Sequence, residues 1–459
     1  MTSQARRTGL SPAASSTIDR YLSLFAGIEE ELAVSGSWLH ATRKAALGRF
    51  AELGFPTPRE DAWKYTRVAK VAEVPFRLPR LSTLVGQVDG LAKHAHHVLD
   101  DRFRIRLVFV NGRYAPVGLS RASALPNGGA VESLSVALKR PARLEPHLGR
   151  IAPFQAHAFT ALNTAFFRDG GFVHLPAGVA LDEPIHLVFV SVAEGEPTMS
   201  TPRILVIAEP GSRATVIEHH VGVGDGVTFT NAVTEIVAGE GSVVEHVKLQ
   251  EESPSSFHVG ALHVQQARDS RFTSRSFSLG GALVRGETHT VLAGEGTHCV
   301  LDGLTLASDA QHMDQITTVD HAQPRGTSRQ LYKSLLGGKA HGVFNGKIIV
   351  RPDAQKTDAS QINKNLLLSE DAAADTRPQL EIFADDVKCA HGAAVGQLDR
   401  ESLFYLRSRG IPEAEAKSLL AWAFVGEMVE RISHEAIRDR VRERVMSRLK
   451  RDQIAGIAA

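Results

Sequence analysis

The stretch GSVVEHVKLQ, residues 241–250, sets the pattern for the middle of the chain: a small pair followed by an alternating run. A comparable pair precedes such a run at six places, which are Gly211-Ser212, Gly241-Ser242, Asp269-Ser270, Gly296-Thr297, Gly326-Thr327 and Asp353-Ala354. Each step also contains a second strand-like run, as at Val227–Ile236 and Phe257–Val264. A two-strand unit that recurs at a near-constant step predicts a solenoid, because one coil cannot bury its apolar face without its neighbours.

Two fold classes fit strands at this spacing. In a parallel β-helix, strands of successive coils pair along the axis, which accounts for the recurrence of the two-strand unit. An antiparallel sandwich or jelly roll also places a strand roughly every 8–12 residues, but it does not require the unit to repeat. We therefore expect a β-helix, and its open strand edges require caps.

Helical patterns at both ends of the chain could supply these caps. Apolar residues at three/four spacing over residues 17–53 predict two helices, the first capped by Ser15, Ser16 or Thr17 and the second ended by Gly54. The charged loop that follows contains Trp63 and Tyr65, and two aromatics in such a loop are typical of a domain junction.

The C-terminal region predicts three more helices. Asp399 can cap the first, Gly410 ends it, and Pro412 suits the first turn of the second. In the last helix four apolar residues repeat every fourth position among arginines, which indicates either a cap with a solvated basic face or a docking surface; they are Ile437, Val441, Val445 and Leu449.

Strand signals also precede the repeat. The run Arg104–Val110 leads into Asn111-Gly112, a strong hairpin signal. A mixed connector to about residue 165 is followed by short apolar runs at Val173–Leu175, Ile185–Val190 and Ile204–Ile207. We therefore divide the chain into a disordered tail (1–16), an N-terminal helical domain (17–100), a β-helix core (101–396) and a C-terminal helical domain (397–459).

Composition excludes several function classes. The 52 basic and 51 acidic residues leave a net charge of +1, which argues against nucleic acid or an acidic membrane as the main partner. Two cysteines cannot form a disulfide framework and fit a reducing compartment, so we expect a cytoplasmic protein. No run approaches the roughly 18 apolar residues of a membrane span. No apolar segment follows Arg6-Arg7, so no secretion signal is expected.

The motifs of common enzymes are also missing. Gly338-Lys339 and Gly346-Lys347 lack the remainder of a Walker A sequence, so the chain is not expected to hydrolyse ATP. A nucleophile–base pair of Cys389 and His391 would need an orienting third group that is not evident. We therefore expect no enzymatic activity.

Three weaker patterns remain. Carbohydrate chemistry is common on parallel β-helices and needs two facing carboxylates; the candidates are Asp302, Asp309, Asp314, Asp320, Asp385 and Asp386. The tract Lys93–His97 is metal-prone by composition alone. Cys299 lies in an expected strand, where a thiol is more often a small buried hydrophobe than a ligand.

The richest stretch in soft ligands is RPQLEIFADDVKCAHGAAVGQ, residues 377–397. Cys389 and His391 lie two residues apart, so on a strand they point the same way. Thiolate and imidazole are ligands that suit iron or iron–sulfur chemistry. A buried cysteine beside a structural histidine is the alternative.

These residues belong to a set of motifs that closely resembles the SufB/SufD family of iron–sulfur cluster assembly scaffolds. The residues that carry the resemblance lie at 354–358, 365–369, 377–382, 384–392 and 404–410, with 332–333 and 343–346 similar to the preceding coils. The segment Gly54–Thr66 is similar to the SufD branch of the family. One departure is Ala390, where the family usually has serine.

The resemblance implies a right-handed parallel β-helix between helical domains. It also implies a complex with SufB, paired through the end of the β-helix, and with two copies of the ATPase SufC, docked on the C-terminal helical domain. The isolated chain could form a homodimer. A reduced flavin is associated with the family's complex, although no flavin motif is identifiable in this sequence.

We therefore interpret the chain as a non-enzymatic SufD-type scaffold. Cys389 and His391 are the expected metal ligands of a transient iron–sulfur cluster. A cluster normally takes four protein ligands, and this stretch offers two, so we expect a partner chain to complete the site. The alternatives are a β-helix carbohydrate-active enzyme and a structural platform for the ATPase with no ligand role.

Overall fold

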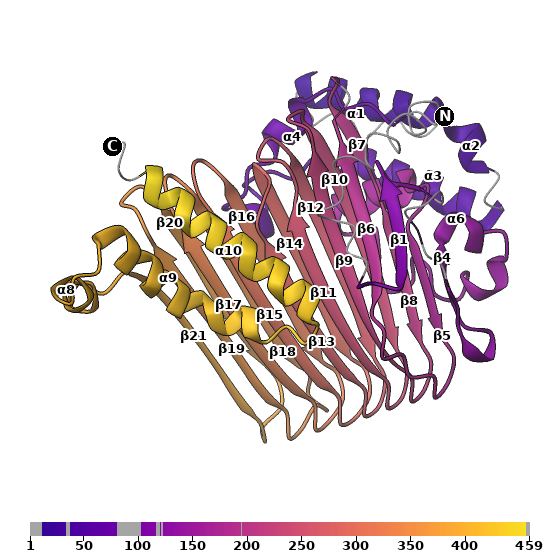
Figure 1. The fold of residues 1–459 in the computed structure, drawn as a ribbon. Helices are drawn as coiled ribbons and strands as arrows, with labels where there is room; N and C mark the ends of the chain where they lie inside the picture. Colours follow the sequence, from indigo (N-terminus) through magenta and orange to yellow (C-terminus); the bar gives the residue numbers. More distant parts are fainter. Residues whose placement is uncertain are drawn as a thin grey trace.

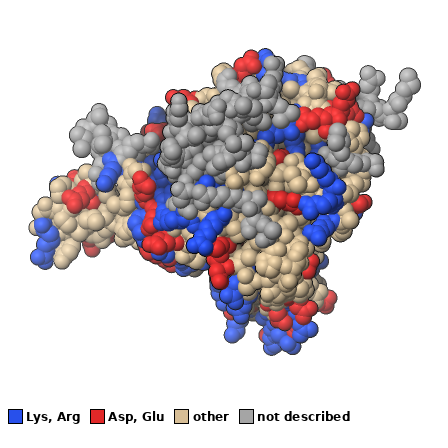
Figure 2. Space-filling model, turned by 45° about the vertical axis from the view of Figure 1, so that its right-hand side comes forward, with Lys and Arg blue, Asp and Glu red and all other residues tan. Residues whose placement is uncertain are grey.

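The computed structural model describes residues 12–33, 37–79, 102–115, 120, 123–193 and 195–455. Residues 1–11 of the expected tail and the Lys93–His97 tract lie outside these ranges. Within the described residues no helix is long and apolar enough to cross a membrane. Figure 2 shows basic and acidic side chains interspersed over the face that it presents, in keeping with the near-zero net charge.

Two long sheets wind around a common interior (Figure 1). One, named here the β21 sheet, has the spatial order β2 (Arg113–Tyr114), β1 (Ile105–Val110), β6 (Ile185–Val192), β9 (Arg213–Val223), β11 (Val243–Glu251), β13 (Arg271–Ser278), β15 (His298–Ala307), β17 (Thr327–Leu336), β19 (Asp358–Leu367), β21 (Lys388–Gln397). The other, the β20 sheet, has the order β20 (Ala373–Ile382), β18 (His341–Val350), β16 (His312–His321), β14 (Leu283–Leu292), β12 (Phe257–Gln266), β10 (Thr228–Ala238), β8 (Arg203–Ala208), β5 (Gly171–Leu175), β4 (Ala130–Ser133), β3 (Ser123–Ala124), with β7 (Thr198–Ser200) beside β10.

The pairing between coils is parallel throughout the repeat. From β9 onward each strand pairs with the strand two places later in sequence, so the chain alternates between the two sheets. In the described residues, antiparallel pairing is confined to β1·β2, β3·β4 and β4·β5, at the N-terminal end of the two sheets. The predicted parallel β-helix is therefore confirmed, and the sandwich alternative is wrong.

The pairs of small residues that mark the repeat lie in turns between strands, and most of these turns contain a residue with a positive φ. Gly211, Gly241 and Gly296 have φ of 68°, 62° and 71°, and Asp269 has 53°. Glycine and short polar residues adopt this left-handed region most readily. The last two pairs were placed wrongly, because Arg325, with φ 58°, and Lys356, with φ 63°, take the left-handed turns instead of Gly326 and Asp353.

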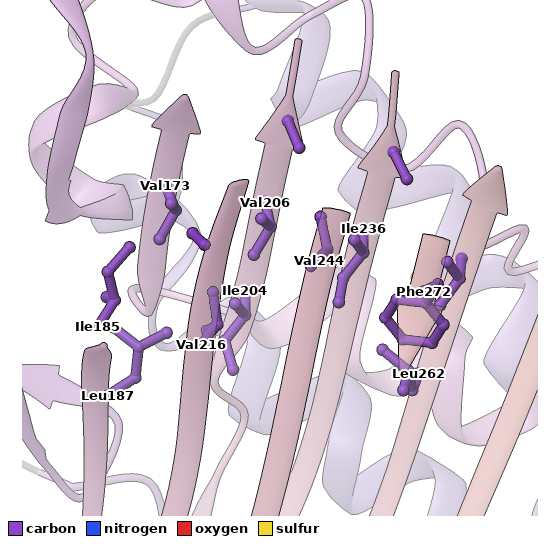
Figure 3. Packing of buried hydrophobic residues seen from close by; sticks show 14 of the residues in the cluster. Val173, Ile185, Leu187, Ile204, Val206, Val216, Ile236, Val244, Leu262 and Phe272 are labelled. Carbon is purple, nitrogen blue, oxygen red and sulfur yellow. The ribbon is translucent and has the colours of Figure 1, made fainter. Parts of the chain in front are cut away.

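Alternate residues of both sheets point into the β-helix and bury an apolar core (Figure 3). Figure 3 shows side chains of the two sheets meeting across the interior, for example Val216 and Val244 from one sheet and Ile236 and Leu262 from the other. Cys299 belongs to this core and is fully buried, as expected of a small hydrophobe. Stacking of coils therefore buries what a single coil would expose.

A polar section continues the same interior. Glu218 accepts hydrogen bonds from His220 (2.7 Å) and Thr234 (2.7 Å). Glu252 accepts from His258 (2.7 Å) and Thr230. All six are almost completely buried, and such groups are tolerated because they satisfy one another. Burial lowers the pKa of His258 to about 4.

Four histidines with lowered pKa values predict that mild acid destabilises the folded chain. Burial lowers the pKa of His219, His312 and His321 to about 4, as it does for His258. Between pH 6.5 and 4 the unfolded chain therefore binds more protons than the folded chain, and the free energy of unfolding falls as the pH falls. Each such histidine contributes a slope of roughly 1.4 kcal/mol per pH unit. Urea unfolding at pH 7, 6 and 5 measures this slope.

His321→Gln provides the matched variant. The His321 imidazole Nε2 lies 2.9 Å from Ser328 Oγ, a contact that glutamine can keep. In this variant we expect the pH dependence of the unfolding free energy to correspond to about one fewer proton bound on unfolding. An unchanged slope, or stability independent of pH above 4, would contradict the assignment of neutral buried histidines.

N-terminal helices cover the outer face of the β20 sheet. They are α1 (Pro12–Ala26), α2 (Glu29–Ala33), α3 (Ser37–Leu53), α4 (Ala69–Glu73), α6 (Leu134–Ala137) and α7 (Ala158–Phe166). Helices α1, α3 and α7 share one apolar cluster with outward residues of β10, β12 and β14. Helix α7 lies inside the range expected to be β-helix; it has nine residues, all of them buried, and it falls in the stretch that was assigned from sequence to the mixed connector.

The charged loop after α3 fastens this layer to the sheet, as the sequence predicted. The Arg285 guanidinium of β14 lies 3.5 Å from the centre of the Trp63 ring. Asp61 makes an ion pair of 2.7 Å with Arg377 of β20. The loop therefore spans several strands of the β20 sheet. Helix α1 begins at Pro12, so Ser15, Ser16 and Thr17 lie inside it and are not its caps.

Three helices follow β21 in the described residues, and the second and third of them cover the outer face of the β21 sheet (Figure 1). They are α8 (Arg400–Ser408), α9 (Glu413–Glu430) and α10 (Glu435–Ala455). Asp399 caps α8 as predicted, because its carboxylate accepts the Ser402 backbone N–H at 2.9 Å. Pro412 is the N-cap of α9 instead of part of its first turn.

Part of the basic face of helix α10 contacts the β-helix. Its four periodic apolar residues are buried against the β21 sheet. Arg440 and Arg444 both contact the Glu251 carboxylate, at 2.7 and 2.5 Å. This part of the basic face is therefore turned onto the chain's own β-helix.

Candidate functional site

Both sheets end at one open end of the β-helix. Strand β20 is the last strand of its sheet and β21 the last of the other. A Cβ at Gly392 or Gly396 of β21 would meet no atom within 4 Å. Three large apolar side chains are exposed there: Ile382, Phe383 and Val395. An edge strand with unpaired backbone groups and exposed apolar side chains is a template for another chain.

Cys389 and His391 lie on β21 and share one face, as the sequence predicted. Cys389 pairs in register with Ala359 of β19, and His391 pairs with Gln361. Ala359 and Gln361 are fully buried inward residues. Side chains at paired positions of a sheet lie on the same face, so the thiol and imidazole face the interior at its open end.

The environments of the two ligands differ. Cys389 is half-buried and packs beside Ala359 and Ile348, whereas His391 is exposed. Burial raises the pKa of the Cys389 thiol above its usual value, so in the isolated chain the thiol keeps its proton at neutral pH. Thiolate is the form that binds metal. A metal or cluster bound there must therefore displace that proton.

Interior polar groups lead from the core to this end. The in-register neighbours of His391 are Gln361 and then Gln330, and Gln361 Nε2 donates to Gln330 Oε1 at 3.3 Å. The corresponding row for the thiol runs from Cys389 through Ala359 and Ser328 to Cys299. The two cysteines thus lie in one row, three strand spacings apart, or about 14 Å. They are too far apart to share one ion.

Four of the six carboxylates proposed for carbohydrate chemistry form ion pairs with basic side chains. Asp302 pairs with Arg431 (3.1 Å), Asp314 with Arg285, and Asp320 with Arg351 (2.6 Å). Asp386 beside the candidate site pairs with Lys356. Each of these carboxylates is held by a basic group, which gives no support to a two-carboxylate catalytic centre.

Two cavities of the described residues lie away from Cys389 and His391. One of about 470 Å³ lies between α10 and the β-helix, lined by Glu251, Gln311 and Arg448 among others. A small one of about 40 Å³ lies between the N-terminal segment and the β20 sheet. Neither lining includes Cys389 or His391. The candidate site is an open surface, which is what a site shared between two chains requires.

Helix α8 is a second exposed feature near this end. Figure 1 shows it projecting away from both sheets, and none of its residues is buried. Phe404 and Tyr405 are 73% and 58% exposed. Two neighbouring exposed aromatics on a projecting helix mark an interaction surface.

Sequence reasoning missed two clusters of metal-ligand side chains. His157, Glu287 and His289 form the first, and His220, Glu252 and His258 form the second; in each, three ligand atoms lie within 4.8 Å of one another. The Glu-x-His spacing at 287–289 is a signal for one strand face. Nothing in the sequence places His157 beside it.

Fold and site together define a helix-flanked parallel β-solenoid with a thiol and an imidazole side chain at an uncovered end. Residues 189–424 match the family model of the SUF system FeS cluster assembly SufBD core domain, and residues 15–187 match that of the SufBD protein N-terminal region. The iron–sulfur cluster assembly protein SufD of Escherichia coli is 33% identical over 406 residues, covering 88% of this chain and 91% of the relative.

Two further relatives agree. An iron–sulfur cluster assembly SufBD family protein of Synechocystis sp. is 33% identical over 434 residues, which cover 92% of this chain and 94% of the relative. SufD of Bacillus subtilis is 26% identical over 426 residues. The chain belongs to the SufBD family, and its role is in iron–sulfur cluster assembly by the SUF system.

Proposed function

We propose that the chain is the SufD-type scaffold subunit of a SUF complex, and that it contributes half of the site where a cluster is built. The observation that carries the proposal is the position of Cys389 and His391. Both lie on the terminal strand of the β-helix and face its uncovered interior end. Two ligands at such an end leave the rest of a four-ligand site to another chain.

The partner proposed for this end is SufB. Unpaired edges of β20 and β21 invite a further coil of the same shape. Exposed Ile382 and Val395 would be covered by that coil. A partner that is itself a β-helix would continue both sheets and close the interior, which would bring its own ligands to Cys389 and His391.

The ATPase SufC is the partner proposed for the C-terminal helices. Helices α9 and α10 are anchored to the β21 sheet by buried apolar residues. Helix α8 packs against α9 and leaves Phe404 and Tyr405 free for a partner. The site carries no nucleotide motif, so ATP chemistry would belong to that partner. Reduced flavin is proposed for the complex alone and is assigned no residue here.

Val395→Arg tests the pairing. A charged side chain at the end of the interior would have to be desolvated when SufB docks, and we expect SufB affinity to fall by about 100-fold. Co-expression followed by purification and titration of SufB against this chain measures the change.

Val136→Arg is the matched control, since Val136 on α6 is 41% exposed and Val395 is 47% exposed. We expect the control to bind SufB like the wild type. Equal SufB affinity in both variants would place the SufB interface elsewhere on the chain.

A further inference from the structure

We propose that His157, Glu287 and His289 form a site for a divalent first-row transition ion, such as Zn²⁺ or Fe²⁺, between the N-terminal segment and the β-helix. His157 immediately precedes α7, while Glu287 and His289 both lie on β14. Their ligand atoms all lie within 4.8 Å of one another. This site is separate from Cys389 and His391, and the proposal does not depend on their role.

The two residues of β14 are spaced as ligands are. His289 Nε2 lies 3.7 Å from Glu287 Oε2, too far for a hydrogen bond. Two ligands bound about 2.0–2.1 Å from a tetrahedral ion lie roughly 3.4 Å apart. His289 Nε2 is buried and has no hydrogen-bond partner in the described residues. A buried nitrogen of this kind is costly unless something binds it.

Neighbouring groups hold the ligands in orientation. Arg285 Nε donates to Glu287 Oε1 at 2.6 Å, which leaves Oε2 to the histidines. Arg285 is itself held by Asp314 and by the Trp63 ring. The His289 ring stacks on His263, with 4.9 Å between ring centres. Contacts of this kind around ligands are typical of metal sites.

The third proposed ligand, His157, lies at the start of a helix. His157 occupies the N-cap of α7, yet its side chain makes no capping hydrogen bond. Its ring centre lies 5.4 Å from that of His289. The cavity of about 40 Å³ beside it is lined by His157 and Glu287, with room for water as a fourth ligand. An ion here would tie residue 157 to β14.

The ligand set selects the class of ion. Two imidazoles and one carboxylate suit Zn²⁺ or Fe²⁺, whereas Mg²⁺ and Ca²⁺ require oxygen ligands. The cluster of His220, Glu252 and His258 differs, because both oxygens of its carboxylate already accept hydrogen bonds, Oε1 from Thr230 and Oε2 from Gln250. Lys248 is also directed toward that cluster, since its Nζ and His258 Nε2 both approach the same point beside Gly260. A cation is disfavoured there.

The test uses the full chain carrying Cys389→Ser and His391→Ala, so that the open end contributes no ligands. The metal-stripped protein is titrated with Zn²⁺, or with Fe²⁺ under anaerobic conditions, against a competing chelator, and bound metal is measured. We expect His157→Ala and His289→Ala each to lower the affinity for one bound Zn²⁺ or Fe²⁺ ion per chain by at least about 100-fold. Zn²⁺ should also raise the thermal midpoint of the parent protein but not of these variants. Mg²⁺ should do neither.

His341→Ala is the control, because His341 pairs with one carboxylate, Asp375, at 2.7 Å. Ions bound by other histidines remain in every sample and cancel in the comparison. Circular dichroism of the metal-free variants confirms folding. If a variant fails to fold, the visible absorption spectrum of Co²⁺ bound to the parent protein tests the site instead. A four-coordinate Co²⁺ site gives intense visible bands. Equal stoichiometry and affinity in parent and folded variants, or no such Co²⁺ bands, would overturn the proposal.

Discussion

Replacing His391 with alanine should leave the purified SUF complex with less than about a tenth of the iron and acid-labile sulfide of the wild type. His391 is exposed on the terminal strand β21, on the same face as Cys389. A four-ligand cluster that loses one protein ligand is exposed to solvent and released. Iron and sulfide are measured after co-expression of all subunits. Cys389→Ala should reduce both in the same way.

His341→Ala is the control for this change. His341 lies on β18, near the same end of the β-helix, and is partly exposed. Its substitution should leave cluster content unchanged. Subunit composition must be the same in both variants, which separates loss of a ligand from loss of a partner. Full cluster content in His391→Ala would show that this residue is no ligand.

The double variant with Phe404→Asp and Tyr405→Asp should bind the ATPase partner with at least 30-fold lower affinity than the wild type. Exposed aromatics on a projecting helix are the side chains that dominate binding energy, and each is worth about 2 kcal/mol when it anchors an interface. The fold should survive, because no residue of α8 is buried. Titration of SufC against the purified chain measures the effect.

Met446→Asp provides the comparison on α10, since Met446 is also exposed but lies outside α8. It should bind the ATPase like the wild type. The SufC-docking proposal fails if the α8 double variant retains full affinity. Cluster content would then have to be explained without ATPase docking at α8.

Much of the β-helix could be predicted because its turns and interior are local properties of the sequence. Gly241 and Asp269 occupy left-handed turns that few residues form, so small residues recur there. The shared face of Cys389 and His391 follows from strand periodicity alone. The Asp399 cap follows from side-chain chemistry at a helix start.

Other features depend on contacts that sequence periodicity does not encode. Helix α7 has nine residues, and its polar side chains, such as Asn163, are uncharged and buried with the apolar ones, so no charged solvent face marks it in the sequence. His157 and His289 are 132 positions apart in the chain and meet because α7 packs on the β20 sheet. The polar interior around Glu218 and Glu252 was unexpected, because alternating patterns are ordinarily interpreted as apolar inside and polar outside.

The central claim is that a cluster is held jointly by this chain and a partner. Its most direct test labels the histidines of this chain with ¹⁵N, leaves the partner subunits unlabelled, and records pulsed EPR of the reduced cluster in the assembled complex. We predict a ¹⁵N hyperfine coupling to the cluster in the wild-type complex and in His341→Ala, and the cluster that remains in His391→Ala should lack this coupling. A cluster that shows no coupling to any ¹⁵N of this chain would contradict the assignment of His391 as a ligand.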